Sequence, residues 1–286
     1  MLRLTSPNYR ENMDALFGPE DAAAWIAVPG PSDDKYSRGV LGVVTGSARY
    51  PGAAVLGVDA ALHTGVGMVR YLGAGRPTRL VLGHRPEAVT ADGRVQAWLL
   101  GSGQEPDGRD ELTALLLETA LTQPVPTIID GGALDLHGSA TGPLVLTPHA
   151  RELGRLLGAD PKAIAADTAS WAQRAAADLD HIVLLKGHTT HVASPDGSLL
   201  AIQAAPNWLA TAGAGDALGG IMGALLATHS ARVVAEPALL APLSAAAAVI
   251  HGMAADRASN GGPFTILDLN REVPRVVADL LRSRGS

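Results

Sequence analysis

Short apolar runs alternate with longer alanine-rich stretches from Val40 onward, and this alternation is the feature that most limits the possible fold. Each run is four to six residues long, apolar on both faces, and bounded by Gly or Pro. Such runs are typical of strands that are covered on both sides, as in a parallel sheet. The regular succession of strands and helices therefore predicts a three-layer α/β/α domain with a mostly parallel central sheet.

The alternation also predicts where the elements lie. Strands are expected at Val40–Thr45, Met68–Leu72, Val95–Leu100, Pro126–Asp130, Pro143–Thr147 and Ile182–Lys186. Helices are expected at Ala53–Thr64, Arg109–Leu121, Glu152–Leu157, Ala165–Asp178, Ala217–Ala227 and Leu243–Ala258, with a short one near Pro19–Ile26. Thr190–Ala193 and Ser198–Ile202 flank a Pro-Asp-Gly turn signal and predict a β-hairpin. We expect an N-terminal arm over residues 1–34 and one domain over residues 35–286.

Charge and composition exclude several classes of protein. The net charge of −6 and the lack of a basic stripe argue against nucleic acid as a partner. The absence of cysteine excludes disulfides, thiol nucleophiles and Cys-ligated zinc. The polar start, Met1 to Arg10, does not have the pattern of a signal peptide. The most apolar stretch, Val233 to Ala255, contains Glu236, His251 and two prolines, so we expect no membrane span and a cytoplasmic protein.

The glycine-rich segment from Thr211 to Gly220 is the strongest candidate for chemistry. Gly213 and Gly215 stand just before an apolar helix, where the backbone can approach a ligand closely and free N–H groups favour an anion. Asp216 then lies beside the expected anion, which suits a base that takes a proton from a hydroxyl group. The alternative is that Asp216 only caps the helix, because Asp is a preferred N-cap residue.

Two further segments follow strands at the edge where open α/β sheets bind ligands. The first is Lys186-Gly187-His188-Thr189-Thr190, whose amides and hydroxyls suit a nucleotide, although a strand-end lysine can also be simply solvated. The second is Thr147-Pro148-His149-Ala150-Arg151-Glu152, in which His149 can donate to a substrate oxygen. Glu152 suits either a Mg²⁺–water shell or a role that complements the helix dipole.

The remaining glycine-rich segments exclude two familiar nucleotide sites. The loop from Gly46 to Ala54 lacks the Gly-Lys-Ser/Thr of a Walker A loop. Gly101-Ser102-Gly103 has Pro106 where a dinucleotide fingerprint needs its third glycine, so a Rossmann oxidoreductase is poorly supported. Asp130-Gly131-Gly132 is compatible with a site or with a turn. His63, His181 and His251 lie at or beside apolar segments and are expected to be structural.

Taken together and in this order, the segments resemble the ADP-dependent NAD(P)H-hydrate dehydratases, a family with a ribokinase-like fold. The resemblance spans Lys35 to Leu281. Its segments are Lys35 to Gly39, Gly52-Ala53-Ala54, Asp130 to Leu134, Thr147-Pro148-His149, Lys186-Gly187 and Gly213 to Asp216. Members are often fused to an epimerase domain, and the roughly 34 residues before the match lead us to expect none here.

The resemblance implies a lyase that repairs a damaged cofactor. NAD(P)H hydrated at C6 of its nicotinamide ring is dehydrated while ADP is split to AMP and phosphate, with Mg²⁺ on the phosphates. Asp216 would activate the hydroxyl group and contact the hydrate, and Ala53, Gly103 and His149 would line the hydrate site. Gly213, Gly215 and the segment Lys186–Thr190 would bind the adenine nucleotide. The family also suggests a homotetramer.

The chain departs from the family pattern at three places. Ala150-Arg151 replaces Pro-Gly after His149, Gly132 replaces the second acid of Asp-Ala-Asp, and Trp208-Leu209 replaces Pro-Gly before the glycine-rich turn. Two alternatives therefore stay open. One is a small-molecule kinase of the same fold, like hydroxyethylthiazole kinase, and the other is a nucleotide-binding regulator without turnover.

Overall fold

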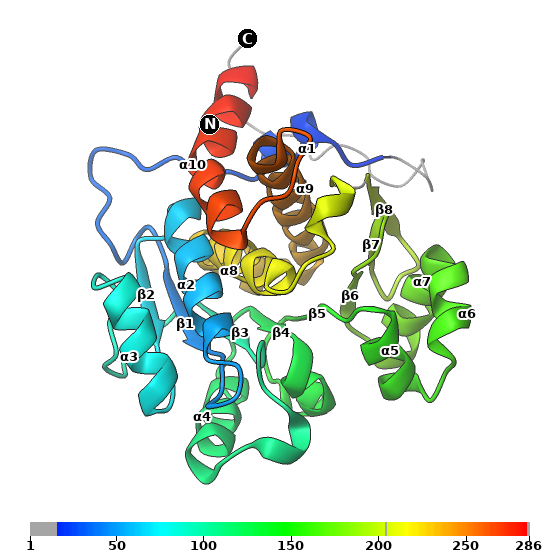
Figure 1. The fold of residues 1–286 in the computed structure, drawn as a ribbon, viewed down its shortest axis with the longest axis horizontal. Helices are drawn as coiled ribbons and strands as arrows, with labels where there is room; N and C mark the ends of the chain where they lie inside the picture. Colours follow the sequence, from blue (N-terminus) through cyan, green and yellow to red (C-terminus); the bar gives the residue numbers. More distant parts are fainter. Residues whose placement is uncertain (1–15, 204, 285–286) are drawn as a thin grey trace.

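The computed structural model describes residues 16–203 and 205–284, in which eight strands form one sheet in the order β2-β1-β3-β4-β5-β6-β7-β8 (Figure 1). The strands are β1 Val40–Val44, β2 Met68–Tyr71, β3 Ala97–Leu100, β4 Thr127–Ile129, β5 Leu144–Leu146, β6 Ile182–Leu185, β7 Thr190–Ala193 and β8 Leu199–Ile202. Strands β1 to β6 are parallel, and β7 and β8 add an antiparallel hairpin at one edge. The six expected strands and the expected hairpin are confirmed.

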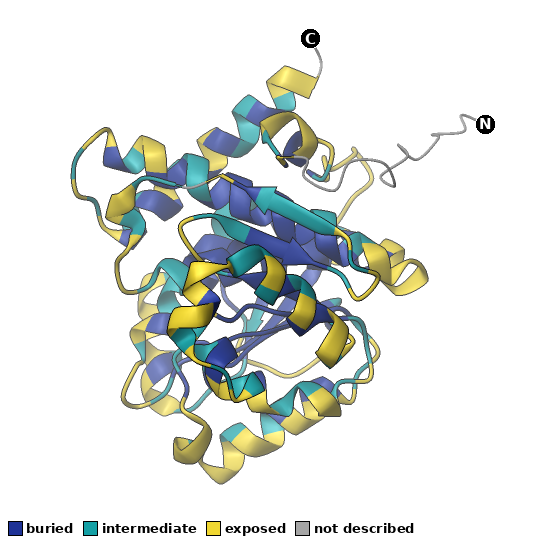
Figure 2. Cartoon of the chain, turned by 90° about the vertical axis from the view of Figure 1, so that its right-hand side faces the viewer, coloured by how far each residue is buried: buried dark blue, intermediate teal, exposed yellow. Residues whose placement is uncertain are grey.

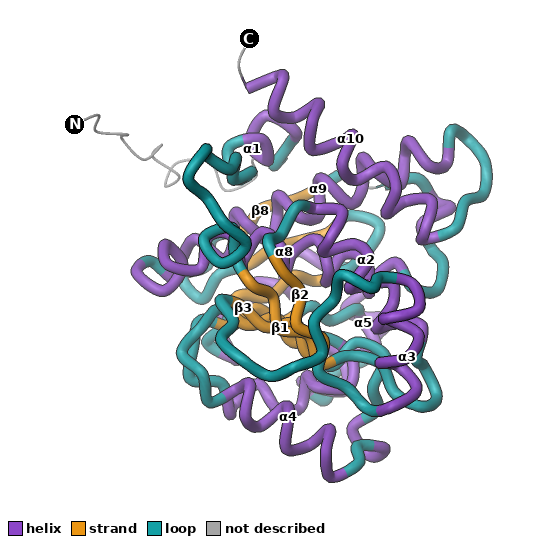
Figure 3. Tube along the Cα trace, turned by 90° about the vertical axis from the view of Figure 1, so that its left-hand side faces the viewer, coloured by secondary structure: helices purple, strands orange, loops and turns teal. Residues whose placement is uncertain are grey.

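Helices cover both faces of this sheet. They are α1 Pro19–Ala23, α2 Gly52–Thr64, α3 Gly75–His84, α4 Glu111–Leu121, α5 Ala150–Leu157, α6 Pro161–Ala166, α7 Thr168–Leu179, α8 Ala214–Ala235, α9 Leu240–Ser259 and α10 Ile266–Arg284, with short 3₁₀ turns η1 Pro106–Gly108, η2 Gly131–Ser139, η3 Asn207–Leu209 and η4 Pro237–Leu239. Adjacent strand residues such as Leu99 and Leu100 point to opposite faces and belong to separate core clusters. Figure 2 shows the buried strands between the two helical layers, and Figure 3 shows α4 on the opposite side from α8 and α9. The predicted three-layer α/β/α architecture is confirmed.

The helix predictions were wrong in two respects. The expected single helix Ala165–Asp178 is two helices, because Asp167 interrupts it and accepts a hydrogen bond from Ser170 N at 3.2 Å to begin α7. Helices α3 and α10 were not expected, since α3 opens with Gly-Arg-Pro and α10 contains Pro274 in its interior. Helix α10 nevertheless buries one apolar face against the first core cluster, so tertiary packing overrides the unfavourable local signal.

Two long segments are apolar enough to cross a membrane by length and composition. They are Ala214–Ala235 and Pro237–Ser259, and 78% and 72% of their most apolar windows are buried inside the structure. Their residues make up much of the first core cluster, so packing within the protein accounts for their apolar character. The described part of the expected N-terminal arm joins the same cluster through Phe17 and Ile26, while residues 1–15 lie outside the described residues.

Helices α2 and α8 approach each other closely because both carry small residues. A side chain at Gly220 would overlap the carbonyl group of Gly57, and one at Gly57 would come within 3.3 Å of the Asp216 carbonyl oxygen. The first turn of α8, which carries Asp216, therefore rests directly on α2. This contact fixes the helix start that the sequence analysis identified.

Candidate active site

Polar side chains gather where four neighbouring parallel strands end. Ser102 follows β3, Asp130 follows β4, Thr147 follows β5 and Lys186 follows β6. The carboxyl ends of parallel strands lie at one edge of a sheet, which is where open α/β folds place their ligand sites. The strand order therefore brings these four side chains together from distant parts of the chain.

A buried ion pair between Asp130 and Lys186 forms the centre of this group. Lys186 Nζ donates to Asp130 Oδ1 at 2.7 Å, and the Lys186 side chain is only 20% exposed. Thr147 Oγ1 donates to Asp130 Oδ1 and Ser102 Oγ donates to Asp130 Oδ2, both at 2.9 Å. The interpretation of Lys186 as a solvated strand-end lysine is therefore wrong.

These contacts decide the charge state of the pair. Burial alone would raise the pKa of Asp130, but the Lys186 ammonium and the hydroxyl donors outweigh it and hold that pKa below its usual range. Burial would likewise lower the pKa of Lys186, but the carboxylates of Asp130 and Glu152 raise it. Both groups are consequently charged at neutral pH.

Asp216 lies in the first turn of α8, facing this pair. The N-cap of α8 is Gly213, which has a left-handed φ of 95° and provides no side-chain cap. The interpretation of Asp216 as the capping residue is therefore wrong. Burial, together with the negative charge of Asp130, raises the pKa of Asp216 to about 7 even though Lys186 acts in the opposite direction. A carboxyl group with this pKa can exchange a proton near neutral pH.

Gly215 leaves open the space between the helix start and the lysine. A Cβ atom added at Gly215 would lie 3.4 Å from Lys186 Nζ. After Lys186 the chain turns through Gly187 and His188, which are exposed, to Thr189 and Thr190, which are partly buried at the start of β7. The glycine-rich turn and the segment from Lys186 to Thr190 therefore border the same polar group.

His149 and Glu152 form a reciprocal cap at the start of α5. His149 Nδ1 accepts from Glu152 N at 3.1 Å, and His149 N donates to Glu152 Oε2 at 2.8 Å. Lys186 N donates to Pro148 O at 2.9 Å, so His149 lies directly beside Lys186, with its side chain 47% exposed. Glu152 lies in the first turn of α5, as its expected role of complementing the helix dipole requires, and it also forms part of this cap.

The loops after β1 and β3 lie side by side near the start of α2. Gly46 N donates to Ser102 O at 2.7 Å. A side chain at Gly103 would overlap Ala53 Cβ and would come within 3.3 Å of Gly46 Cα. Ala53 and Gly103, both expected at the hydrate site, are thus packed against each other. Gly103 directly follows Ser102, which donates to Asp130.

The three histidines that were expected to be structural are engaged within the protein. His63 Nδ1 lies 3.5 Å from Asp59 Oδ2. His181 meets His137 edge to face with ring centroids 5.6 Å apart. His251 is buried, and burial lowers its pKa to about 4, so it is neutral at pH 7.

Sequence reasoning undervalued Asp130, which is the centre of the polar group. The available signal was a carboxylate at the end of one buried strand and a lysine at the end of another, in a sheet expected to be mostly parallel. A single sequence does not give that order, so Asp130-Gly131-Gly132 was equally compatible with a turn. In the structure η2 begins at Gly131, and Asp130 itself is the buried ion partner.

The parallel sheet with helices on both faces, and the polar group at the carboxyl ends of its strands, are those of a ribokinase-like protein. Comparison with a family model described as NAD(P)H-hydrate dehydratase gives a match over residues 41–274. The chain belongs to the NAD(P)H-hydrate dehydratase family.

Several named relatives match at moderate identity. A bifunctional NAD(P)H-hydrate repair enzyme from Mycobacterium tuberculosis H37Rv is 45% identical over 74% of this chain and 46% of its own length. The chain therefore spans about half the length of this curated relative. An ADP-dependent (S)-NAD(P)H-hydrate dehydratase from Neisseria meningitidis serogroup B is 36% identical over 78% of both chains.

A solved structure agrees with the family. The ADP/ATP-dependent NAD(P)H-hydrate dehydratase of Bacillus subtilis, co-crystallised with ATP and Mg²⁺, has a TM-score of 0.81 and 25% identity, and the match covers 94% of this chain and 99% of that one. The ribokinase-like fold expected from the sequence is therefore confirmed.

The buried pair gives the first testable prediction. Lys186→Met should lower the free energy of unfolding by about 3–5 kcal/mol, because Asp130 is left buried without its cation. The double variant Asp130→Asn, Lys186→Met should recover much of this loss. Because the pKa of Asp130 is lowered, the contribution of the pair is complete above the unfolded value of 3.8 and is lost as the pH falls further.

Denaturant unfolding at pH 7 measures these changes. Arg49→Met is the matched control, since it breaks the exposed Arg49–Glu105 pair at 3.0 Å and should cost no more than about 1 kcal/mol. Equal losses for Lys186→Met and Arg49→Met would contradict the central position of the buried pair.

Proposed function

We propose that this protein dehydrates C6-hydrated NAD(P)H at the expense of ADP, releasing NAD(P)H, AMP and phosphate. The observation that carries the proposal is Asp216, a carboxyl group with a pKa near neutrality in the first turn of α8, facing the Asp130–Lys186 pair. The activities for which the relatives from Neisseria and Bacillus are named support the same reaction. We further propose, on the basis of the family, that the enzyme is a cytoplasmic homotetramer.

The chemistry needs a better leaving group than hydroxide. The C6 oxygen of the hydrate attacks the β-phosphorus of ADP while Asp216 takes the hydroxyl proton, and the bond from the β-phosphorus to AMP breaks. Phosphate then leaves C6 with its bonding electrons, driven by the ring nitrogen, and loss of a proton from C5 restores the double bond. Phosphoryl transfer of this kind depends mainly on positioning and charge stabilisation.

In this proposal, each predicted residue has a place around Asp216. Gly213, Gly215 and the segment Lys186–Thr190 hold the adenine nucleotide, with the free N–H groups of α8 facing its phosphates. Lys186 adds positive charge while its pairing with Asp130 keeps its ammonium in place. Ala53, Gly103 and His149 line the hydrate site, where Asp216 meets the C6 hydroxyl.

Mg²⁺ would bind at this site mainly through the phosphates of the nucleotide. Among residues 16–203 and 205–284 there is no group of three or more histidine or acidic side chains suited to a metal ion. Glu152 is already engaged, because it caps α5 and its Oε2 lies 3.8 Å from Lys186 Nζ. Mg²⁺ usually binds proteins through few carboxylates together with substrate phosphates and water. It would neutralise phosphate charge during transfer.

Incubation with ADP, Mg²⁺ and NADH hydrate tests the proposal. We expect the absorbance of NADH to return while AMP and free phosphate accumulate in equal amounts. A phosphorylated product that persists would identify a small-molecule kinase instead. Nucleotide binding without consumption would identify a regulator.

Asp216→Asn should lower turnover by about 10²–10⁴, because the amide keeps the shape of the side chain but cannot accept the proton. In the wild type, kcat/KM should rise with pH up to about 7 and then level off, because Asp216 must lose its proton before it can act as a base. Asp178→Asn, which removes one partner of the exposed Arg174–Asp178 pair on α7, is the control and should be neutral. Wild-type turnover in Asp216→Asn would end the assignment of Asp216 as the base.

Gly215→Val tests the position of the nucleotide. A valine side chain would fill the space between the helix start and Lys186, where a Cβ alone already comes within 3.4 Å of Nζ. We expect ADP affinity to fall by at least about tenfold, as for a ligand that loses its close approach to backbone N–H groups. Isothermal titration with ADP measures this, and unchanged affinity in a folded variant would place the nucleotide elsewhere.

A further inference from the structure

An exposed tryptophan stands in the segment that leads into the glycine-rich turn. Trp208 lies on η3 and is 52% exposed. The other tryptophans differ, because Trp98 is buried and Trp25 and Trp171 are partly buried. Within residues 16–203 and 205–284 no hydrogen bond or ring contact engages the Trp208 indole. Tryptophan is highly buried on average, so Trp208 leaves a large apolar ring surface open to a ligand.

The sheet places this segment beside the predicted nucleotide residues. Strand β7 begins at Thr190, the last residue of the segment Lys186–Thr190, and in the antiparallel register Thr190 lies opposite Ile202, the last residue of β8. Strand β8 therefore ends at the same edge of the sheet as the parallel strands. The chain then continues to Gly213, the N-cap of α8 (Figure 1). Trp208 thus lies between the two parts of the proposed nucleotide site.

Tight turns on both sides of Trp208 hold its backbone in place. Leu209 N donates to Pro206 O at 2.8 Å, and Thr211 N donates to Leu209 O at 2.7 Å. The Leu209 side chain is partly buried and packs against the first core cluster. The residue next to Trp208 is therefore anchored in the core, while the indole itself stays at the surface.

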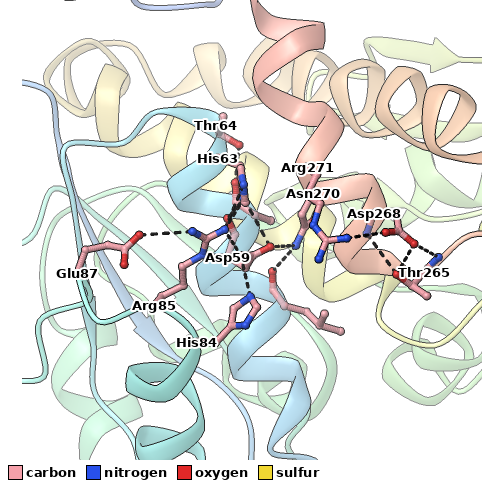
Figure 4. Close-up of polar contacts among 12 residues, drawn as sticks. Asp59, His63, Thr64, His84, Arg85, Glu87, Thr265, Asp268, Asn270 and Arg271 are labelled. Carbon is pink, nitrogen blue, oxygen red and sulfur yellow. Dashed lines mark hydrogen bonds and ion pairs between the residues drawn. The ribbon is translucent and has the colours of Figure 1, made fainter.

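Helices α2 and α10 fix the turn at the end of this segment. A Cβ atom added at Gly213 would lie 2.5 Å from Leu56 Cδ1 and 3.2 Å from Ile266 Cγ1. Asn270 on α10 is buried, and its Nδ2 donates to Leu56 O at 3.2 Å and to Asp59 Oδ2 at 2.8 Å (Figure 4). These contacts join α10 to α2 on either side of the turn. A ring presented from a fixed loop loses little conformational freedom when a ligand binds.

The composition of the segment selects the kind of group that Trp208 can contact. Residues 205–213 include no charged side chain, so this surface does not offer a further phosphate contact. The phosphates are instead provided for by the free N–H groups of α8 and by the Lys186 ammonium. What remains of a nucleotide is its flat, neutral base. Stacking of a base on an aromatic side chain contributes affinity and requires only a π face.

We infer that Trp208 stacks on the base of the nucleotide whose phosphates lie at the start of α8. This inference rests on the proposed function and deepens it, because it names the side chain that recognises the base and the class of bases that the site accepts. Stacking responds to the size of the π face more than to a hydrogen-bond pattern. The site therefore prefers purine nucleoside diphosphates to pyrimidine ones.

Trp208→Ala tests the inference in isothermal titrations without hydrate, so that no turnover is needed. We expect the affinity for ADP to fall by about fivefold or more, and the preference for ADP over CDP to shrink. Trp208→Phe keeps a ring and should retain the ADP affinity within about threefold. Inorganic pyrophosphate, which has no base, should bind the wild type and both variants alike.

Tryptophan emission gives an independent measure of stacking. ADP should quench the emission of the wild type and should change that of Trp208→Phe little, since the remaining tryptophans are buried or partly buried. Leu115→Ala is the matched control, because it removes a large apolar side chain that is 59% exposed on α4, in the other helical layer. Its ADP affinity and quenching should match the wild type.

Steady-state kinetics separate failure of this inference from failure of the proposed function. In Trp208→Ala, KM for ADP should rise by about fivefold or more with kcat little changed, since the base binds but does not react. A protein that shows the expected ADP titrations but does not dehydrate NADH hydrate would remove the proposed function and keep the inference. An active Trp208→Ala with unchanged KM for ADP would do the reverse.

Three other results would overturn the inference. The first is equal ADP affinity in the wild type and Trp208→Ala. The second is an equal loss of pyrophosphate and ADP affinity in Trp208→Ala, which would indicate damage to the phosphate site in place of a lost base contact. The third is a changed oligomeric state of Trp208→Ala in size-exclusion chromatography with unchanged ADP affinity, which would assign Trp208 to a contact between subunits.

Discussion

The ion pair between Asp130 and Lys186 is the interaction on which the site depends. It joins the ends of β4 and β6, two strands separated in the sheet by β5, and the hydroxyl groups of Ser102 and Thr147 complete its hydrogen bonds. A buried charge is costly unless it is paired and hydrogen-bonded, so these partners are required together. The pair holds the Lys186 ammonium in place at the carboxyl ends of the strands, close to Gly215 in the first turn of α8.

The same pair separates the behaviour of two neighbouring carboxyl groups. Asp130 has the lysine and two hydroxyl donors and stays charged, whereas Asp216 is partly buried and faces the negative charge of Asp130. When their environments move the pKa values of two carboxyl groups apart, one group can stay charged while the other exchanges a proton. Many active sites obtain a base at neutral pH in this way. Asp130 therefore organises the site electrostatically, and Asp216 is left as the group that can exchange a proton.

The sequence predicts the layers of this fold better than its site. Short apolar runs identify the six parallel strands because strands buried on both faces need apolar residues throughout. Helix α10 escapes prediction because burial of one face outweighs Pro274, and that burial is a property of the assembled protein. The glycine-rich turn before Asp216 is visible from local chemistry, whereas the partnership of Asp130 with Lys186 depends on a strand order that spacing does not give.

The contact between Gly57 on α2 and Gly220 on α8 also constrains how such a protein can change during evolution. The first turn of α2 carries Ala53 of the proposed hydrate site, and the first turn of α8 carries Gly215 of the proposed nucleotide site. The glycine contact leaves no gap between the two helices, so neither can shift alone. A core substitution that moves α2 therefore moves α8 with it. New substrate preferences are accordingly expected to arise from replacements in the loops and on α3, while substitutions along the α2–α8 seam occur in compensating pairs.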